Sequence, residues 1–179
     1  MAKIHLDRRL PVGAEILKDG GVHFRVWAPK CDHVEVVLVD RDDNNAIRDS
    51  LVLRAEERGY FAGIAERAQA GDCYWYRLDH QETLYPDAAS RYQKDGPHGP
   101  SQIVDPSLFP WTDGKWRGVE LRGQVIYEMH VGTFTPEGNW GAATLELAEL
   151  ADCGITLIEL MPIADFPGRF GWGYDGVNL

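Results

Sequence analysis

The stretch from Gly123 to Leu179 constrains the fold most, because its hydrophobic pattern changes period twice. It begins with an apolar run, Gln124–Val131, that is rich in β-branched and aromatic residues. Proline and glycine interrupt the pattern over residues 133–141. An apolar run that ends in such breakers predicts a strand followed by a turn.

After this turn, the apolar residues recur at steps of three and four, which predicts an amphipathic helix from Ala142 to Cys153. Gly154 is placed to end that helix. The run Ile155–Leu160 follows at once, and it is apolar enough to be buried on both faces as a second strand. Strand, helix and strand together predict a right-handed βαβ unit. Ligands of parallel α/β folds bind at the carboxyl ends of the strands, so we expect a site in the loop Met161–Leu179.

The N-terminal half, residues 1–88, predicts an antiparallel β-sandwich. Its short apolar runs are separated by turn residues. In the run Val22–Trp27, apolar residues alternate with His23 and Arg25, as in a strand with one buried face. The other expected strands are 33–39, 51–53, 59–64 and 72–78, with residues 41–45 as a hairpin tip.

Residues 89–122 predict a linker with fixed turns, because proline and glycine recur without a sustained period. The barrel-like part would then occupy 123–179. Trp111 and Trp116 lie within the linker. Tryptophans in loops more often pack a linker against a domain than bind a ligand, so we expect these two to pack.

Composition excludes several classes of function. Lys and Arg number 18 against 28 Asp and Glu, so the net charge of −10 disfavours nucleic acid as a partner. No apolar run approaches the roughly 20 residues that cross a bilayer, and the first ten residues lack the apolar centre of a signal peptide. We therefore expect a cytoplasmic protein without a membrane partner. Cys31, Cys73 and Cys153 match no metal or disulfide pattern and are expected to be buried thiols.

Specific motifs add a family resemblance to this pattern. YEMHVGTFT, GITLIELMPIADFPG and GWGYDGVNL resemble the first two strand–loop segments of the α-amylase superfamily barrel, glycoside hydrolase family 13. Within it, DFPGRFGWGYDGVNL is most similar to the malto-oligosyltrehalose trehalohydrolase family, and SRYQKDGPHGPSQIVDP resembles the segment that joins the two N-terminal domains of that family. Lys94 departs from the proline expected there. The strands of the first half resemble the immunoglobulin-like carbohydrate-binding module family 48.

The resemblance implies a fold and an activity. The fold is a β-sandwich followed by the first βαβ segment of a (β/α)8 TIM barrel, truncated at Leu179. The activity is hydrolysis of the α-1,4-glucosidic bond next to the terminal trehalose of maltooligosyl trehalose, with no cofactor and no metal. The partner would be that substrate or a related α-glucan. Alternatives are the N-terminal part of a glycogen-branching or debranching enzyme, or a non-catalytic glycan-binding module. The superfamily carries its catalytic carboxylates after later strands, so we expect no catalytic residue here and no activity from this chain alone.

The expected substrate-binding residues are Tyr174, Trp172, Asp175 and His130. Tyr174 matches the superfamily position whose ring stacks on a sugar. The structural alternative is a tyrosine that only stabilises the glycine-rich loop. Trp172 and Asp175 either shape the same pocket or only hold the loop. His130 lies on the first strand, where a polar side chain is as often a satisfied structural residue as a ligand contact.

Other polar and aromatic residues favour structural roles. Glu128 and Glu159 lie on the expected strands, and Asp165 precedes Phe-Pro-Gly as a turn-former. The aromatic residues of the sandwich would suit glycan binding, but alternation places about half of them inside; they are Trp27, Tyr60, Tyr74, Trp75 and Tyr76. Two barrel strands leave apolar faces and edges uncovered, so we expect the second half to pair with another copy in a homo-oligomer or to be poorly ordered.

Overall fold

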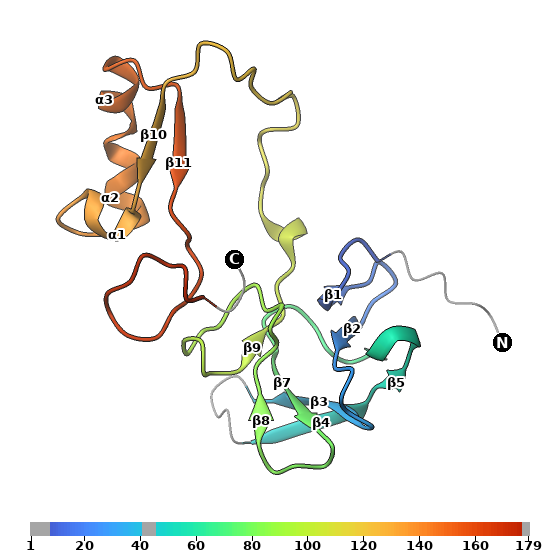
Figure 1. Cartoon of the computed structure of the whole chain (residues 1–179). Helices are drawn as coiled ribbons and strands as arrows, with labels where there is room; N and C mark the ends of the chain where they lie inside the picture. Colours follow the sequence, from blue (N-terminus) through green and yellow to red (C-terminus); the bar gives the residue numbers. More distant parts are fainter. Residues whose placement is uncertain (1–7, 41–45, 177–179) are drawn as a thin grey trace. The chain divides into compact units, whose positions relative to one another are not determined.

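The structure, a computed structural model, describes residues 8–40 and 46–176. Over these ranges the chain forms two compact units that divide between Phe109 and Pro110. Figure 1 follows both units along the chain from blue to red. No helix in the described ranges combines the length and the apolar character that crossing a membrane requires.

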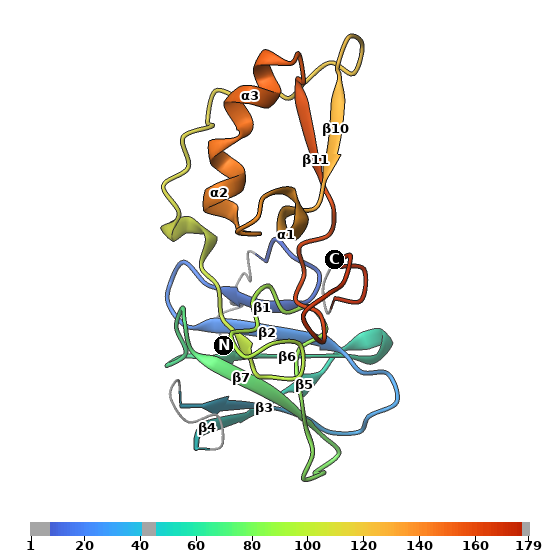
Figure 2. The ribbon, with the colours of Figure 1, turned by 90° about the vertical axis from the view of Figure 1, so that its left-hand side faces the viewer.

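The first unit is a sandwich of two antiparallel sheets, as predicted. Their strand orders are β1-β2-β6-β5 and β4-β3-β7-β8, with β9 paired to β7 as well (Figure 2). The first sheet consists of β1 (Gly13–Ile16), β2 (Val22–Trp27), β6 (Tyr60–Ala65) and β5 (Arg54–Ala55). The second consists of β4 (Ile47–Val52), β3 (Val34–Val39), β7 (Cys73–Leu78), β8 (Leu84–Tyr85) and β9 (Ser101–Gln102). Two short 3-10 turns, η1 (Glu57–Gly59) and η2 (Pro106–Leu108), complete the unit.

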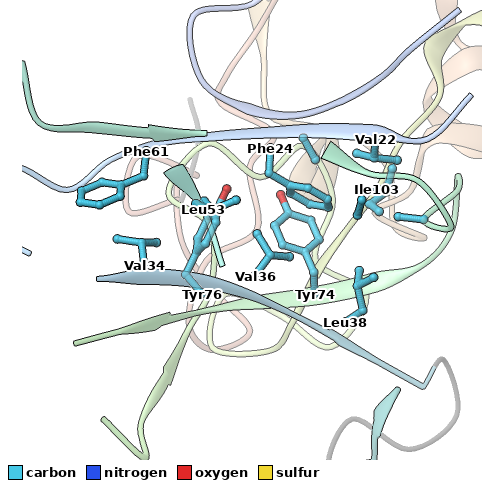
Figure 3. Packing of buried hydrophobic residues seen from close by; sticks show 13 residues of the cluster. Val22, Phe24, Val34, Val36, Leu38, Leu53, Phe61, Tyr74, Tyr76 and Ile103 are labelled. Atoms are coloured by element: carbon cyan, nitrogen blue, oxygen red, sulfur yellow. The ribbon is translucent and has the colours of Figure 1, made fainter. Parts of the chain in front are cut away.

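The core lies between the two sheets and is made by the inward-facing residues of each. Phe24 of β2 meets Tyr74 of β7 edge to face, with ring centroids 4.9 Å apart. Figure 3 shows these rings pointing toward one another across the sandwich, beside Val36 of β3. All three are at most 1% exposed. Burial of a large apolar side chain stabilises a fold by about 1.5–3 kcal/mol, so this contact contributes to holding the two sheets together.

The strand β2 has the predicted bounds, but His23, which alternation places on the exposed face, is buried. His23 is only 3% exposed. The guanidinium of Arg8 donates to its Nδ1 at 2.7 Å and to its carbonyl oxygen at 3.0 Å. A buried polar ring requires such a partner, and here the partner comes from a distant part of the chain. The predicted hairpin of β3 and β4 is confirmed by their antiparallel register, while its tip, residues 41–45, lies outside the described residues.

The expected linker is divided between the two units. Ile103 is 1% exposed and belongs to the core of the sandwich. Gln102 of β9 donates from its side chain to the carbonyl of Gly71 at 2.9 Å. Residues 89–109 therefore fold with the first unit, and the second unit begins at Pro110. Trp111 and Trp116 are 65% and 67% exposed, so neither ring is buried.

The second unit contains the expected parallel strand pair. The strands β10 (Ile126–Met129) and β11 (Leu157–Leu160) pair in register from Ile126 with Leu157 to Met129 with Leu160, and both are shorter than predicted. Between them lie α1 (Val131–Phe134), α2 (Trp140–Leu145) and α3 (Leu147–Asp152). The helices lie beside the strand pair in both views (Figure 2).

The helix predicted from Ala142 to Cys153 is present but interrupted at Glu146, where α2 and α3 meet. Asn139 begins α2 by accepting a hydrogen bond from the backbone of Ala142 at 3.0 Å. The hydroxyl of Thr144 donates to the carbonyl of Trp140 at 2.8 Å, a bond from a threonine to the residue four before it that bends helices. Gly154, at φ +92°, ends α3 as predicted, in a conformation that glycine adopts readily.

The strand pair keeps apolar surface uncovered, as predicted for two barrel strands alone. Ile126 and Leu160 are 47% and 42% exposed, so the run Ile155–Leu160, although apolar enough for it, is not buried on both faces. Two strands with helices beside them cannot cover both faces of the pair. The cysteines also differ from expectation: Cys73 is buried, Cys31 is partly exposed and Cys153 is exposed at the end of α3.

Candidate functional site

The loop after β11 closes on itself at a narrow neck. At one end, the backbone N–H of Met161 donates to the carbonyl of Met129 at 3.0 Å. At the other end, His130 Nε2 lies 3.0 Å from the carbonyl oxygen of Gly171. Two consecutive residues at the carboxyl end of β10 thus hold both ends of residues 161–171, which has the form of an Ω-loop. Figure 1 shows this segment in dark red as a ring that turns back toward its start.

Glycines allow the returning strand of this loop to approach the outgoing one. A Cβ on Gly173 would overlap the carbonyl of Pro162, and φ at Gly173 is +88°. A Cβ on Gly171 would lie 2.8 Å from the ring of Phe166. The glycines therefore pack inward, and the residues between and after them, Trp172 and Tyr174, are 73% and 56% exposed.

A cavity of about 980 Å³ lies between this loop and the segment that follows β10. Aromatic rings contribute much of its lining. A single carboxylate, Glu137, and a single guanidinium, Arg169, are the charged groups among the described residues that line it. The lining residues are His130–Thr133, Pro136–Gly138, Trp140, Met161–Ala164, Phe166 and Arg169–Trp172.

The four expected site residues occupy different places relative to this cavity. His130 and Trp172 line it, whereas Tyr174 and Asp175 are not among its described lining residues. Tyr174 and Asp175 are exposed on the returning part of the loop. The structure thus brings His130 and Trp172 together at the cavity, and Tyr174 follows Trp172 by two residues along the chain.

The ring of His130 is fixed by contacts within the protein. Since a carbonyl oxygen can only accept, Nε2 carries the proton that bonds to Gly171. Nδ1 is buried and has no hydrogen-bond partner among the described residues. A Cβ built on Gly132 would lie 3.2 Å from this atom, so the absence of a side chain at Gly132 leaves the ring its room.

The other acidic residues considered from the sequence in the second unit remain on its surface. Glu128 and Glu159 are register partners on the strand pair, and both are exposed, as is Asp165 in the loop. No group of three or more His, Cys, Asp or Glu that could hold a metal ion occurs within the described part of the chain. The described cavity therefore offers aromatic surfaces and hydrogen-bonding groups for a ligand, and one carboxylate rather than a pair.

The aromatic residues of the sandwich divide between inside and outside, as alternation predicts. Tyr74 and Tyr76 are 1% and 2% exposed in the core. Trp27 is 60% exposed, and its indole N–H donates to the carbonyl of Arg58 at 3.1 Å. The guanidinium of Arg25 lies 3.9 Å from the ring centroid of Tyr60, which is partly buried.

Known proteins share both units of this chain. The profile of Carbohydrate-binding module 48 (Isoamylase N-terminal domain) matches residues 11–106, more than half of the 179 residues. The chain belongs to the carbohydrate-binding module 48 family. The match ends near the boundary of the first unit, so the module comprises the sandwich and includes β9.

Relatives extend the similarity beyond the module. Malto-oligosyltrehalose trehalohydrolase from Saccharolobus solfataricus is 42% identical over 91% of this chain and 28% of that protein. A 1,4-alpha-glucan branching enzyme from Xanthomonas oryzae is 31% identical over 98% of this chain and 26% of that protein. A crystal structure from Salmonella typhimurium, of a protein provisionally named alpha amylase, has a TM-score of 0.81 and 39% identity over 93% of this chain and 27% of that one. The chain thus spans little more than a quarter of each of these proteins, and it matches the N-terminal part of the trehalohydrolases.

Several cavity residues were missed from the sequence. Trp140, Phe166 and Phe170 line the cavity. Phe166 and Phe170 belong to the motif DFPGRFGWGYDGVNL, but the motif itself does not show which of its rings face a ligand. The available signal was their density, because the segments that flank β10 and β11 are rich in aromatic residues and glycine. Only the folded loop shows which of these rings face a common space.

Proposed function

We propose that this chain is the N-terminal part of a glycoside hydrolase that acts on α-glucans. The specific reaction we propose is hydrolysis of the α-1,4 bond next to the terminal trehalose of maltooligosyl trehalose, with release of trehalose. The 42% identity to the Saccharolobus solfataricus trehalohydrolase supports this choice over the branching reaction, whose named relative is 31% identical.

The observation that carries the proposal is the parallel pairing of β10 with β11, whose carboxyl ends both lead toward the 161–176 loop. In a (β/α)8 barrel, substrates bind at this end of the strands. We propose that the pair and its helices are the first βαβ segment of such a barrel. Trp172 and Tyr174 would then offer ring faces to the apolar face of a sugar.

The proposed share of this chain in the chemistry is substrate binding rather than proton transfer. A retaining glycosidase uses two carboxyl groups about 5–5.5 Å apart, one as the nucleophile and one as the acid and base. The cavity holds Glu137 alone among its described lining residues. We therefore place the catalytic pair in the part of the relatives that lies beyond the match.

The test is trehalose release by an extended protein. This protein joins residues 1–179 to the part of the Saccharolobus solfataricus enzyme that lies beyond the aligned region. We expect the extended protein to release trehalose from maltooligosyl trehalose, and the 179-residue chain alone to release none. Turnover by the pure chain would contradict the proposed division of labour. An extended protein that is folded by circular dichroism but inactive would contradict the reaction.

The branching alternative needs a second extended protein, in which residues 1–179 are joined to the part of the Xanthomonas oryzae branching enzyme that lies beyond its aligned region. A branching enzyme breaks an α-1,4 bond and transfers the released segment to form an α-1,6 linkage, so the number of reducing ends stays unchanged and no trehalose is freed. Proton NMR of the products separates the two reactions, because α-1,6 and trehalose anomeric signals differ. New α-1,6 linkages from the second protein, without trehalose from the first, would favour the branching relative.

A further inference from the structure

The loop neck at the end of β10 contains one side chain whose place is fixed without any ligand. Met129 bonds the start of the loop through its backbone, an arrangement that any residue could provide. His130 bonds the end of the loop through its side chain, at a sequence separation of 41 residues. Only the second contact depends on the identity of the residue.

The imidazole is poorly placed to contact a ligand with its free nitrogen. Nδ1 is buried and lacks a partner, and Gly132 leaves room for the ring by lacking a Cβ, which would lie 2.9 Å from His130 Cε1. The other nitrogen is occupied by the carbonyl of Gly171. Both nitrogens are thus withdrawn from hydrogen bonding to a molecule in the cavity, although the edge of the ring lines it.

We propose that His130 is a positioning residue that closes the neck of the 161–171 loop and thereby holds Trp172 and Tyr174 in place. Gly171 directly precedes Trp172, so a fixed Gly171 carbonyl also fixes the backbone from which Trp172, and after it Tyr174, projects. Gly173 continues the same constraint by packing on Pro162. The importance of this placement for α-glucan binding rests on the proposed function, whereas the neck itself rests on geometry alone.

The effect of the neck on loop order can be measured in the whole chain without a ligand. His130→Phe keeps a planar ring but cannot donate a hydrogen bond, whereas His130→Gln keeps an N–H donor. Gly132→Ala retains the histidine and displaces its ring, so it tests the same contact independently. Backbone ¹⁵N relaxation reports order on the picosecond to nanosecond scale, with order parameters near about 0.85 for rigid and below about 0.6 for flexible segments.

We expect order parameters of residues 171–176 to be high in the wild type, to fall below about 0.6 in His130→Phe and Gly132→Ala, and to be largely restored in His130→Gln. Residues 126–129 and β2 should stay unchanged, and the ¹⁵N spectrum should show the His130 proton on Nε2. An unchanged loop in His130→Phe, or an equal loss of order in β10, would overturn the proposal. Failure of this test would leave the trehalose assay unaffected, and the converse also holds.

Discussion

Arg48 of β4 donates two hydrogen bonds, at 2.6 and 3.1 Å, to the carboxylate of Asp72, which directly precedes β7. The side chain of Asp72 is fully buried, while that of Arg48 is 41% exposed. The backbone N–H of Gln69 donates to the same carboxylate at 3.1 Å. The pair therefore ties the edge strand β4 to the turn that leads into the centre of its sheet.

Loss of this guanidinium should destabilise the module. We expect Arg48→Met to lower the free energy of unfolding by about 1–3 kcal/mol, because the buried carboxylate loses its cation. This loss in free energy of unfolding is smaller than that expected for a fully buried ion pair, because the Arg48 side chain is partly exposed to water. Urea unfolding followed by circular dichroism measures it. Arg54→Met, at an exposed arginine of β5, is the matched control and should change stability by less than about 0.5 kcal/mol. Equal effects of the two substitutions would contradict the role of the pair.

Glu15 should stabilise the module in a pH-dependent way. Burial alone would raise its pKa, but the backbone N–H groups of Arg9 and Leu10 and the Arg9 side chain bring the pKa below its ordinary value. A lowered folded pKa contributes stability above the ordinary pKa, and this contribution is lost as the pH falls through the folded value. We expect Glu15→Gln to cost about 1–3 kcal/mol at neutral pH and progressively less as the pH falls below the ordinary pKa of a glutamate. A cost that does not vary with pH would rule out this linkage.

Asp87 should show the opposite dependence. It is 1% exposed and accepts hydrogen bonds from the Tyr74 hydroxyl at 2.7 Å and the Ala89 backbone at 2.8 Å. Burial raises the pKa of this carboxyl despite these bonds. A raised folded pKa means that the module gains stability as the pH falls through it, until the unfolded chain is protonated as well. The free energy of unfolding of the wild type, relative to that of Asp87→Asn, should therefore rise as the solution is acidified. A change in the same direction as at Glu15 would show that the buried charge is not destabilising.

Local patterns were sufficient to predict the sandwich. The bounds of β2 and the pairing of β3 with β4 follow from apolar alternation and turn residues, which act over a few positions. The burial of His23 could not be predicted this way, because its partner, Arg8, lies 15 residues away and meets it only in the fold. Likewise, β9 is two residues long and carries no period, so its pairing with β7 is a tertiary effect.

The site shows the same division. The loop after β11 was predicted as the site because ligands of parallel α/β folds bind at the carboxyl ends of the strands, and Trp172 and His130 do line a common cavity. The bond from His130 to Gly171 was missed, because sequence spacing says nothing about a contact across 41 residues. The break between α2 and α3 was missed because the bond from Thr144 to Trp140 competes with the helix pattern without changing the apolar period.

The exposed strand pair should make the chain associate. Ile126 and Leu160 are 47% and 42% exposed on strands whose outer edges have no partner among the described residues. Uncovered apolar edges favour pairing with another copy. We expect light scattering to give a mass that rises with concentration, and Ile126→Glu to reduce this rise. Val52→Glu, at an exposed position of β4 in the first unit, is the control and should leave it unchanged.

A monomeric sample gives a second check of the same feature. Where the chain is monomeric, amides of Ile126 and Ile158 should exchange faster than that of Val26 in the sandwich, because less apolar surface covers them. Strong and equal protection at all three would show that the second unit is stable without a partner.

Tyr174 provides the most direct test of whether the 161–176 loop is a sugar-binding element. In the extended protein, Tyr174→Ala should lower kcat/KM for maltooligosyl trehalose by more than about tenfold, because a stacked ring contributes about 0.5–1.5 kcal/mol and also positions the sugar. Tyr174→Phe, which keeps the ring, should be milder. The measurement is trehalose release at substrate concentrations well below KM. The predicted result is a large loss with alanine and a small one with phenylalanine; unchanged kinetics for Tyr174→Ala beside a loss for Trp172→Ala would contradict the assignment of stacking to Tyr174.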